Sequence, residues 1–587
     1  MILFAEQSGL QAVDWLLIAL YAIATIGLGV YFSRQQTNTD EYFVGSRNMN
    51  PVLIGVSLFA TLLSTISYLS MPGEAAGKGP VVMIGLLALP LVFSVVALFL
   101  LPVYMKQRVT SAYELLEERL GLSVRLLGAS MFLALRLVWM TLLVYLAAKA
   151  MTIMMGVDFW TIHLANMTVA SGRISDLADS AAKLPGFFRW EDSQLTITTV
   201  PVVILFTGIV SLIYTSLGGL RAVVVTDFMQ TILLFGGALL VLATVTYQFG
   251  GLGWFPTRWQ PTWDTQPIFS FDPRTRVTAV GTVLSVFAWF VATMGGDQTT
   301  VQRFMATRDA AAAKRAVATQ LCVATVVQLT LFLVGFALLA YFLKHSDQLP
   351  AGMQVKKNAD FLFPRFISHH LPVGVSGLVV AAMFAAAMSS IDSGVNSITA
   401  VVQTDFLGRL GWKLKSERAQ VRAAQLMAFG IGITVVLGSS LMKYIEGNIT
   451  AVTNKTVNLL TTPIFALFFF ALFVRWAKPL GVWIGAVFGV TTAAAIAFSG
   501  PLVVFLATQC GVDPGWFGVE LLTHIDPATG IETTTTAVRE MNAETGLAEL
   551  VRRDPVSFQW IGPVALVVNI SVGMLVSWFL PARRLND

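Results

Sequence analysis

The sequence predicts an all-α polytopic membrane protein, and two observations support this prediction. Hydrophobic residues make up 56% of the 587 residues and charged residues only 12%, whereas a soluble domain carries about 25% charged residues. Apolar runs long enough for a transmembrane helix, about 20 residues each, recur along the whole chain. So little charge cannot cover a soluble domain of this length. The net charge of +5 is small for this length and gives no indication of nucleic-acid binding.

The apolar runs predict about thirteen transmembrane helices by the same length criterion. The first run is expected to remain in the protein rather than to be a cleaved signal peptide, because the N-terminal segment carries Glu6 and Asp14 and has no basic region. The runs lie at 13–32, 51–72, 80–104, 126–155, 197–217, 226–248, 276–296, 316–343, 372–404, 424–442, 450–474, 479–505 and 557–580.

The loops between the runs predict the orientation of the chain, because short loops rich in Arg and Lys face the cytoplasm. With the N-terminus outside, most basic residues fall in short inner segments, among them Arg47, Arg303, Arg308 and Arg409. We therefore expect a multi-pass protein of the cell (inner) membrane, with its N-terminus outside and its C-terminus in the cytoplasm. The longer loops then lie outside, at 156–196, 249–275, 345–371 and 511–556.

Two of these outer loops, 156–196 and 511–556, are polar and rich in Thr, Asp and Glu. Ile525–Thr535 is expected to form a hairpin or a disordered stretch. Either loop could cap the outer mouth of the protein, and neither carries a pattern that suggests catalysis.

The second run carries a dense stripe of small hydroxyl residues. Such residues within a membrane either bind a ligand or support helix packing, since Ser and Thr also bond to carbonyls of their own helix. Both interpretations remain open for this stripe, which consists of Ser57, Thr61, Ser64, Thr65 and Ser67.

A second polar group lies in the run at 372–404. Ser389, Asp392 and Ser393 are spaced i, i+3 and i+4, so they share one helix face. Hydroxyl, carboxylate and carbonyl oxygens suit a hard alkali cation such as sodium, whereas zinc prefers His or Cys. The alternative is that Asp392 is solvated at the inner end of this span.

The remaining polar residues of the spans also allow two interpretations. Asp227 is either a buried functional acid or the cap of a helix N-terminus. Arg136 either pairs with an acid or receives an anionic substrate. Lys149 and Lys455 are expected to extend toward the membrane surface. Gly295-Gly296 either breaks a helix, as in transporters, or simply ends it.

Five stretches together resemble the sodium:solute symporter family, which includes sodium–glucose, sodium–sialic acid and sodium–monocarboxylate carriers. Their order and spacing match the family across about 40–475, most of the chain, and five motifs in register are far more specific than one. The stretches are Asp40–Arg47, Ser111–Arg119, Tyr214–Asp227, Gly296–Met305 and Ala387–Ser393.

The resemblance implies a LeuT-like fold of five plus five helices in two inverted repeats. On this chain, residues 1–50 would form an extra N-terminal span and a cytoplasmic loop. The first repeat would be 51–248, with the outer loop 156–196, and the second 275–474. Residues 475–587 would add two C-terminal spans with the outer loop 511–556.

The resemblance also implies site residues. The main sodium site would consist of Ala60, Leu63, Ala386, Ser389 and Ser390. A second sodium site or an inner gate would include Asp227, Asp392 and Ser393, and Asp392 stands where the sialic acid carriers have serine. The glycine that sugar carriers have at the break of their first core helix is absent. Candidate substrate contacts are Ser64, Ser67, Arg136 and Asn454.

The predicted function is therefore sodium-coupled symport of a small organic solute (a sugar, a sugar acid or another carboxylate) by alternating access. Sodium is the expected ion, with no transition metal and no nucleic-acid partner. A proton-coupled transporter that uses Asp227 or Asp392 and a solute sensor without transport are the alternatives. No nucleophile elbow, His-rich metal site or paired His and carboxylate lies in the spans, so the sequence does not predict an enzyme.

Overall fold

The structure is a computed structural model of the chain. It describes residues 10–34, 36, 38–63, 65–107, 109–157, 159–163, 168–172, 188–191, 194–349, 353–356, 358–411, 416–444, 449–525, 532–541 and 548–581.

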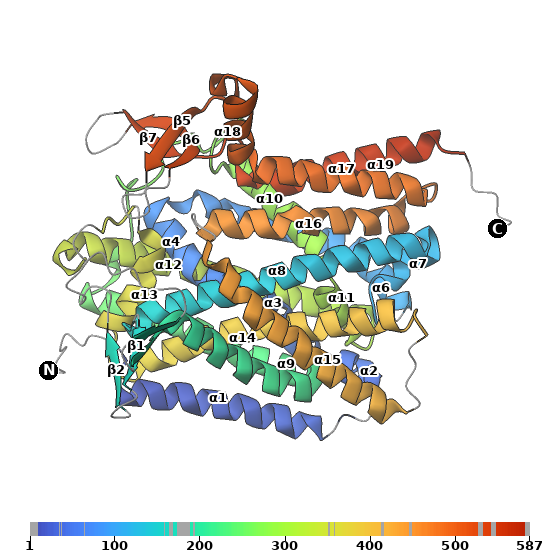
Figure 1. The fold of residues 1–587 in the computed structure, drawn as a ribbon, viewed down its shortest axis with the longest axis horizontal. Coiled ribbons are helices and arrows are strands. Elements are labelled where there is room, and N and C mark those ends of the chain that lie inside the picture. The colour runs from blue at the N-terminus through green and yellow to red at the C-terminus, as the bar shows by residue number, and fades with distance from the viewer. Residues whose placement is uncertain are drawn as a thin grey trace.

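Long apolar helices that lie roughly along one direction form the body of the molecule (Figure 1). They begin and end close to the predicted apolar runs, because charged loop residues interrupt the hydrophobic pattern there. Among the longest, α8 and α12 have 34 and 35 residues, more than the about 20 that one crossing needs. The helices are α1 (Ala12–Ser33), α3 (Pro51–Leu62), α4 (Thr65–Gly77), α8 (Leu122–Met155), α9 (Thr199–Gln248), α10 (Ala279–Gly296), α12 (Ala310–Lys344), α14 (Val375–Val401), α15 (Glu417–Ser439), α16 (Ile449–Phe473), α17 (Pro479–Ala497) and α19 (Ile561–Phe579). The shorter α18 (Ser499–Cys510) follows α17 and runs across this direction (Figure 1).

One further span is built from consecutive short helical segments, and shorter helices connect the spans. The segmented span consists of η2 (Pro80–Ala88), α5 (Leu89–Val95), η3 (Val96–Leu100) and α6 (Leu101–Gln107). The connecting helices are α2 (Thr39–Val44), η1 (Gly45–Arg47), α7 (Glu114–Leu120), η5 (Leu252–Trp254), α11 (Gln298–Met305), η6 (Ser346–Gln348), α13 (Ala359–His370), η7 (Val402–Leu407), η8 (Ser440–Tyr444), η9 (Pro514–Phe517) and η10 (Phe558–Trp560).

The number of membrane crossings agrees with the predicted thirteen when the two parts of α9 are counted separately. Among the described residues, 11 helices are long and apolar enough to cross a membrane, and the bent pair α3 and α4 raises this number to 12. α9 counts as one helix of 50 residues, but Gly219 within it has non-helical dihedral angles. Its two parts correspond to the separate runs predicted at 197–217 and 226–248.

The contacts of α9 with α14 indicate that its two halves run in opposite directions. In the first half, Phe206 packs on Phe384 and Ser211 donates to Asp392, so residue numbers rise together on both helices. In the second half, Ser389 donates to Asp227, while a side chain at Gly237 would meet Val379, so the numbers rise in opposite senses. α9 is therefore a helical hairpin that turns at Gly219, which supplies the thirteenth crossing.

Two small antiparallel sheets, which a criterion based on apolar runs does not detect, lie in the long polar loops. The first has the strand order β2-β1-β4-β3 and the second β5-β6-β7. β5 and β6 pair from Glu520 opposite Ala537 to Ile525 opposite Glu532, in agreement with the first of the two expected alternatives, a hairpin; residues 526–531 lie outside the described part of the chain. The strands are β1 (Phe159–His163), β2 (Thr168–Gly172), β3 (Phe188–Glu191), β4 (Gln194–Thr198), β5 (Glu520–Ile525), β6 (Glu532–Met541) and β7 (Ala548–Arg552).

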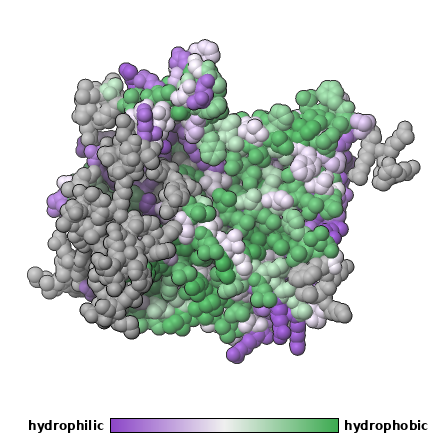
Figure 2. Space-filling model, in the orientation of Figure 1, coloured by the Kyte–Doolittle hydropathy of each residue, from purple (hydrophilic) through white to green (hydrophobic). Residues whose placement is uncertain are grey.

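Both sheets lie at the end of the molecule at which α1 begins, whereas α19 ends at the opposite end (Figure 1). Apolar residues cover the middle of the visible face and hydrophilic residues gather toward its ends (Figure 2). Large apolar side chains such as Leu87, Leu91 and Leu98 are exposed. This distribution is that of a protein surrounded by lipid, so the chain is a multi-pass membrane protein.

Two helices are broken at equivalent places, the first span of each predicted repeat. α3 and α4 meet at an angle of 67°, after Leu63 has left the helical conformation. α10 and α11 are separated by Asp297, whose backbone is extended. Such breaks within a membrane leave polar backbone groups that must be satisfied by protein or by a ligand. Gly295-Gly296 therefore precedes a true helix break.

Gly219 is expected to be intolerant of a side chain. Its φ of 56° and ψ of −162° fall in a region that only glycine adopts readily, and a Cβ would lie 2.7 Å from the carbonyl oxygen of Tyr42. We predict that Gly219→Ala lowers the free energy of unfolding by about 1–3 kcal/mol, measured as a lower thermal midpoint in detergent. Gly236→Ala on the same helix is the control, because no atom lies within 4 Å of its Cβ position. Equal midpoints for the two variants would contradict the hairpin turn.

Candidate functional site

The C-terminal end of α3 lies against the middle of α14. The Thr61 hydroxyl is 3.0 Å from that of Ser393, and Thr65 donates to the carbonyl of Met383 over 3.4 Å. α3 ends at Leu62, and the last four carbonyl groups of a helix have no partner within it. These carbonyls also carry the negative end of the helix dipole. The α3–α14 junction therefore presents oxygen atoms suited to a cation.

All five residues predicted for the main sodium site lie at this junction. Ala60 and Leu63 are at the end of α3, and Ala386, Ser389 and Ser390 follow one another along α14. None is more than 4% exposed. The Ser390 hydroxyl donates to the carbonyl of Ala386 over 3.3 Å, a long and therefore weak hydrogen bond. A cation could recruit both oxygen atoms at little cost.

Asp227 lies in a fully buried polar cluster next to this junction. Its carboxylate accepts hydrogen bonds from Ser57 of α3 and from Ser389 of α14, both 2.5 Å long. Asp227 belongs to the interior of α9, so the interpretation of this residue as a helix cap is wrong. The carboxylate instead joins three helices that are far apart in the sequence.

Arg303 of α11 provides the positive charge of the cluster. Its Nη2 lies 3.2 Å from Oδ2 of Asp227 and donates to Ser393 over 2.6 Å, while Nε donates to Ser57 over 2.8 Å. Arg303 is completely buried, as is the whole of α11, so the expectation of an exposed loop residue is wrong. The guanidinium lies between Asp227 and Ser393, two residues of the predicted second sodium site.

Asp392, the other acid predicted for that second site, faces a different part of α9. Ser211, Tyr214 and Thr215 donate their hydroxyls to its carboxylate, the last over 2.5 Å. These three residues are spaced i, i+3 and i+4 and share one helix face. Asp392 is fully buried, so the interpretation as a solvated residue at a helix end is wrong. The structure thus separates Asp392 from Asp227.

Arg136, in the middle of α8, pairs with Asp297 at the break between α10 and α11. Its Nη2 lies 2.9 Å from each oxygen of the carboxylate, and the two residues are only 6% and 7% exposed. Asp297 also caps α11 by accepting a hydrogen bond from the Thr299 amide over 2.8 Å. The predicted structural pairing of Arg136 is therefore present, at a place where transporters bind solutes.

Two tyrosines donate hydrogen bonds to the backbone carbonyl groups at this break. Tyr104 at the end of the segmented span donates to the carbonyl of Gly295, and Tyr113 donates to that of Gly296 over 3.3 Å. Both tyrosines are completely buried. The break is thus a defined conformation with its carbonyl groups satisfied.

The other predicted substrate contacts are only partly placed. Ser64 lies outside the described residues. Ser67 lies in α4 and Asn454 in the first turns of α16, and α16 packs against both α4 and α8. The helices that carry Ser67, Arg136 and Asn454 are therefore neighbours. Lys455 pairs with Asp554 rather than extending freely to the surface.

Sequence reasoning overlooked the pairing role of Arg303 and gave no role to Asp297 or Ser211. Both Asp297 and Arg303 fall within Gly296–Met305, a stretch that the resemblance already singled out. A cap-type residue directly after two glycines is a usable signal for Asp297. Ser211 and Thr215 look like ordinary packing residues in the sequence, and only the partner helix reveals their role.

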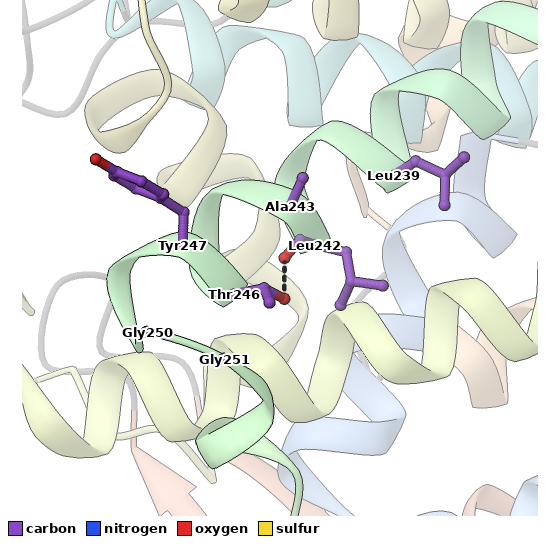
Figure 3. Close-up of a pocket in the computed structure, with 7 residues that line it drawn as sticks. All are labelled: Leu239, Leu242, Ala243, Thr246, Tyr247, Gly250 and Gly251. Carbon is purple, nitrogen blue, oxygen red and sulfur yellow. Dashed lines mark hydrogen bonds between the residues drawn. The ribbon is translucent and has the colours of Figure 1, made fainter.

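A surface groove of about 720 Å³ lies elsewhere, along residues 239–251 at the end of α9 (Figure 3). Apolar side chains such as Leu239 and Leu242 line it, and Thr246 bonds to its own helix at the carbonyl of Leu242. Tyr247 is 81% exposed. The groove opens on the outer surface of the protein, and neither Arg136 nor Asp227 lines it.

Two broken helices beside buried oxygen clusters and a buried arginine are an arrangement typical of membrane transporters. A model of the sodium:solute symporter family matches residues 42–170 and 194–489, which is well over half of the chain. The chain belongs to the sodium:solute symporter family. It is accordingly a sodium-coupled transporter of a small solute and not an enzyme.

Comparisons with individual proteins agree with this assignment. The sodium/sialic acid symporter SiaT of Proteus mirabilis (strain HI4320) is 29% identical over 83% of this chain and 89% of its own length. Human sodium-coupled monocarboxylate transporter 1 is 24% identical over 98% and 88%. A solved Na+-coupled sialic acid symporter, substrate-bound and outward-open, has a TM-score of 0.70 at 24% identity over 98% of this chain and all of its own. The chain thus has the predicted LeuT-like fold.

The Asp227–Arg303 pair is expected to be essential for stability. Removing one partner of a buried ion pair leaves the other charge uncompensated and costs about 3–5 kcal/mol. We predict a large loss of thermal stability for Asp227→Asn in detergent. Glu520→Gln, which breaks the exposed pair with Arg539, should cost less than about 1 kcal/mol. Similar midpoints for both variants would show that the pair is not a principal contact.

Proposed function

We propose that this chain imports a carboxylate-bearing solute together with sodium, and that the main sodium ion binds at the α3–α14 junction. The observation that carries the ion assignment is the convergence of the free carbonyl end of α3 with the hydroxyls of Ser389 and Ser390. Ala60, Leu63 and Ala386 would contribute carbonyl oxygens. Such a set of neutral, hard oxygen ligands matches the preference of an alkali cation.

The proposed solute class rests on Arg136. A buried guanidinium can bind a carboxylate with two parallel hydrogen bonds, and Arg136 lies on a helix that packs against α16. Relatives named for sialic acid and for monocarboxylates both take solutes that carry a carboxylate. Ser64, Ser67 and Asn454 would contact the remainder of the solute.

The proposed orientation places the two sheets outside and the C-terminal end of α19 in the cytoplasm of a cell membrane. It is supported by the basic short loops and by the position of the sheets at the end where α1 begins (Figure 1). The proposed repeats are 51–248 and 275–474, each of which starts with a broken helix. The spans before and after them would complete the scaffold.

The proposed mechanism is alternating access. Sodium at the junction would bridge α3 and α14 and favour the outward-open state, and the solute would then bind beside the two breaks. Coupling needs only that both ligands favour the same state, which requires a few kcal/mol. Asp227 would act near the inner exit, where its hydrogen bond to Ser389 connects it to the sodium ligands.

Uptake into proteoliposomes tests this function. We expect accumulation of a carboxylate under an inward sodium gradient and little uptake under a pH gradient alone. The candidate solutes are sialic acid, short monocarboxylates and neutral sugars. Uptake that responds to the pH gradient and not to sodium would favour the proton-coupled alternative, for which the buried carboxylate of Asp392 is the candidate carrier.

Ser390→Ala tests the ion site within the same assay. Loss of one hydroxyl ligand should raise the sodium concentration that gives half-maximal uptake by about tenfold, since removing a ligand costs of the order of 1–2 kcal/mol. Ser94→Ala is the control, because Ser94 is exposed and bonds only within its own helix. An unchanged sodium titration in Ser390→Ala would remove the proposed site.

Arg136→Gln tests the solute class by thermal shift. The wild-type midpoint should rise with a carboxylate in sodium buffer, as expected for any ligand that binds only the native state. The variant should lose the shift for acids. If the acids still stabilise Arg136→Gln as strongly as the wild type, Arg136 is not the anchor.

A further inference from the structure

The charge of Arg136 is already compensated before any solute arrives. Asp297 contacts Nη2 with both carboxylate oxygens at 2.9 Å, and burial of both residues keeps water from screening the pair. The arginine and the aspartate together carry no net charge. A carboxylate that binds beside them would therefore add an uncompensated negative charge to a buried site, which is costly.

The other buried arginines of the spans are also paired with acidic side chains. Arg303 pairs with Asp227, and Arg125 pairs with both Asp405 and Glu117. Neither is available to compensate a solute. Within the described part of the chain, each buried arginine near the two helix breaks thus already has an acidic partner, and the buried carboxylate of Asp392, which accepts from hydroxyls, adds no positive charge.

Arg136 nevertheless has unused hydrogen-bonding capacity. Its Nε is buried and has no hydrogen-bond partner among the described residues. The hydroxyls of Thr293, Thr299 and Thr300, which flank Asp297 in the sequence, are also buried without a partner in that part of the chain. Unsatisfied buried polar groups are rare in proteins and indicate a missing ligand or water. The site can thus bind a polar ligand while Asp297 stays in place.

We propose that Asp297 makes the solute site electrically neutral, so that a carboxylate binds tightly only when sodium supplies the compensating positive charge. This inference rests on the proposed function and identifies a residue that sets both the solute's charge and its dependence on sodium. Without Asp297, Arg136 alone would attract the anion and sodium would be needed less. With Asp297, one sodium ion and one carboxylate restore neutrality.

Asp297→Asn separates this role from a structural one. Asparagine keeps a side-chain oxygen that can cap α11, since Asn and Asp are equally good caps, and removes only the charge. We expect acid binding without sodium to strengthen. The ratio of dissociation constants without and with saturating sodium should fall at least fivefold, within the range of measured couplings of about 5–150-fold.

The measurement is isothermal titration of purified protein in choline or sodium chloride, with sialic acid, lactate and pyruvate as probes. Asp297→Glu keeps the charge and should keep the wild-type ratio. Glu74→Gln removes another buried acid that pairs with an arginine, Arg276, near the end of α4 that lies farthest from its break, and should also leave the ratio unchanged. The methyl ester of sialic acid, which has no charge, should bind Asp297→Asn and wild type alike.

The outcomes distinguish the two proposals. If the wild type binds none of the acids in sodium, the proposed function fails and this inference fails with it. If the wild type binds an acid with sodium dependence and Asp297→Asn shows the same ratio, only the inference is overturned. Weaker acid binding by Asp297→Asn in both buffers would also overturn it, because Asp297 would then only position Arg136.

Discussion

The carboxylate of Asp227 is the contact on which the interior of this protein depends. Ser57, Ser389 and Arg303 bond to it from α3, α14 and α11, and Asp227 itself lies in α9. Water is absent from the hydrocarbon core of a bilayer, so polar groups there are satisfied by partners within the protein or line a cavity. The carboxylate of Asp227 provides such a partner for both predicted repeats, because Ser57 lies in the first and Ser389 and Arg303 lie in the second. The ends of the two broken helices are positioned relative to α14 through this cluster.

The same principle explains why so many charges are tolerated inside the membrane. Each arginine of the interior that the structure describes has an acidic partner from a distant segment: Arg136 with Asp297, Arg303 with Asp227, and Arg125 with Asp405. A buried pair adds little net stability compared with an apolar pair of the same size. Its contribution is to specify which helix ends meet, and here those ends are the breaks at which ion and solute are proposed to bind.

The membrane spans could be predicted from the sequence because the lipid bilayer requires long apolar runs. This requirement applies to each segment separately and does not depend on which helices pack against it. The hairpin of α9 was visible as two runs for the same reason. The partners of the polar residues could not be predicted, since a pairing such as Asp392 with Ser211 depends on helix rotation, which run length does not determine. Arg303 was assigned to a loop because a helix as short as α11 leaves no apolar signature. The five ligands of the main sodium site came from resemblance to a family and remain a prediction.

Tyr104 and Tyr113 affect how the break between α10 and α11 can change its angle. Tyr104 and Tyr113 reach the carbonyls of Gly295 and Gly296 from segments outside the broken helix. A change of angle at the break displaces one or both carbonyls and must therefore break hydrogen bonds whose donors are completely buried. A buried group left without its hydrogen-bond partner costs about 1–3 kcal/mol, so the two tyrosines stabilise the present angle of the break.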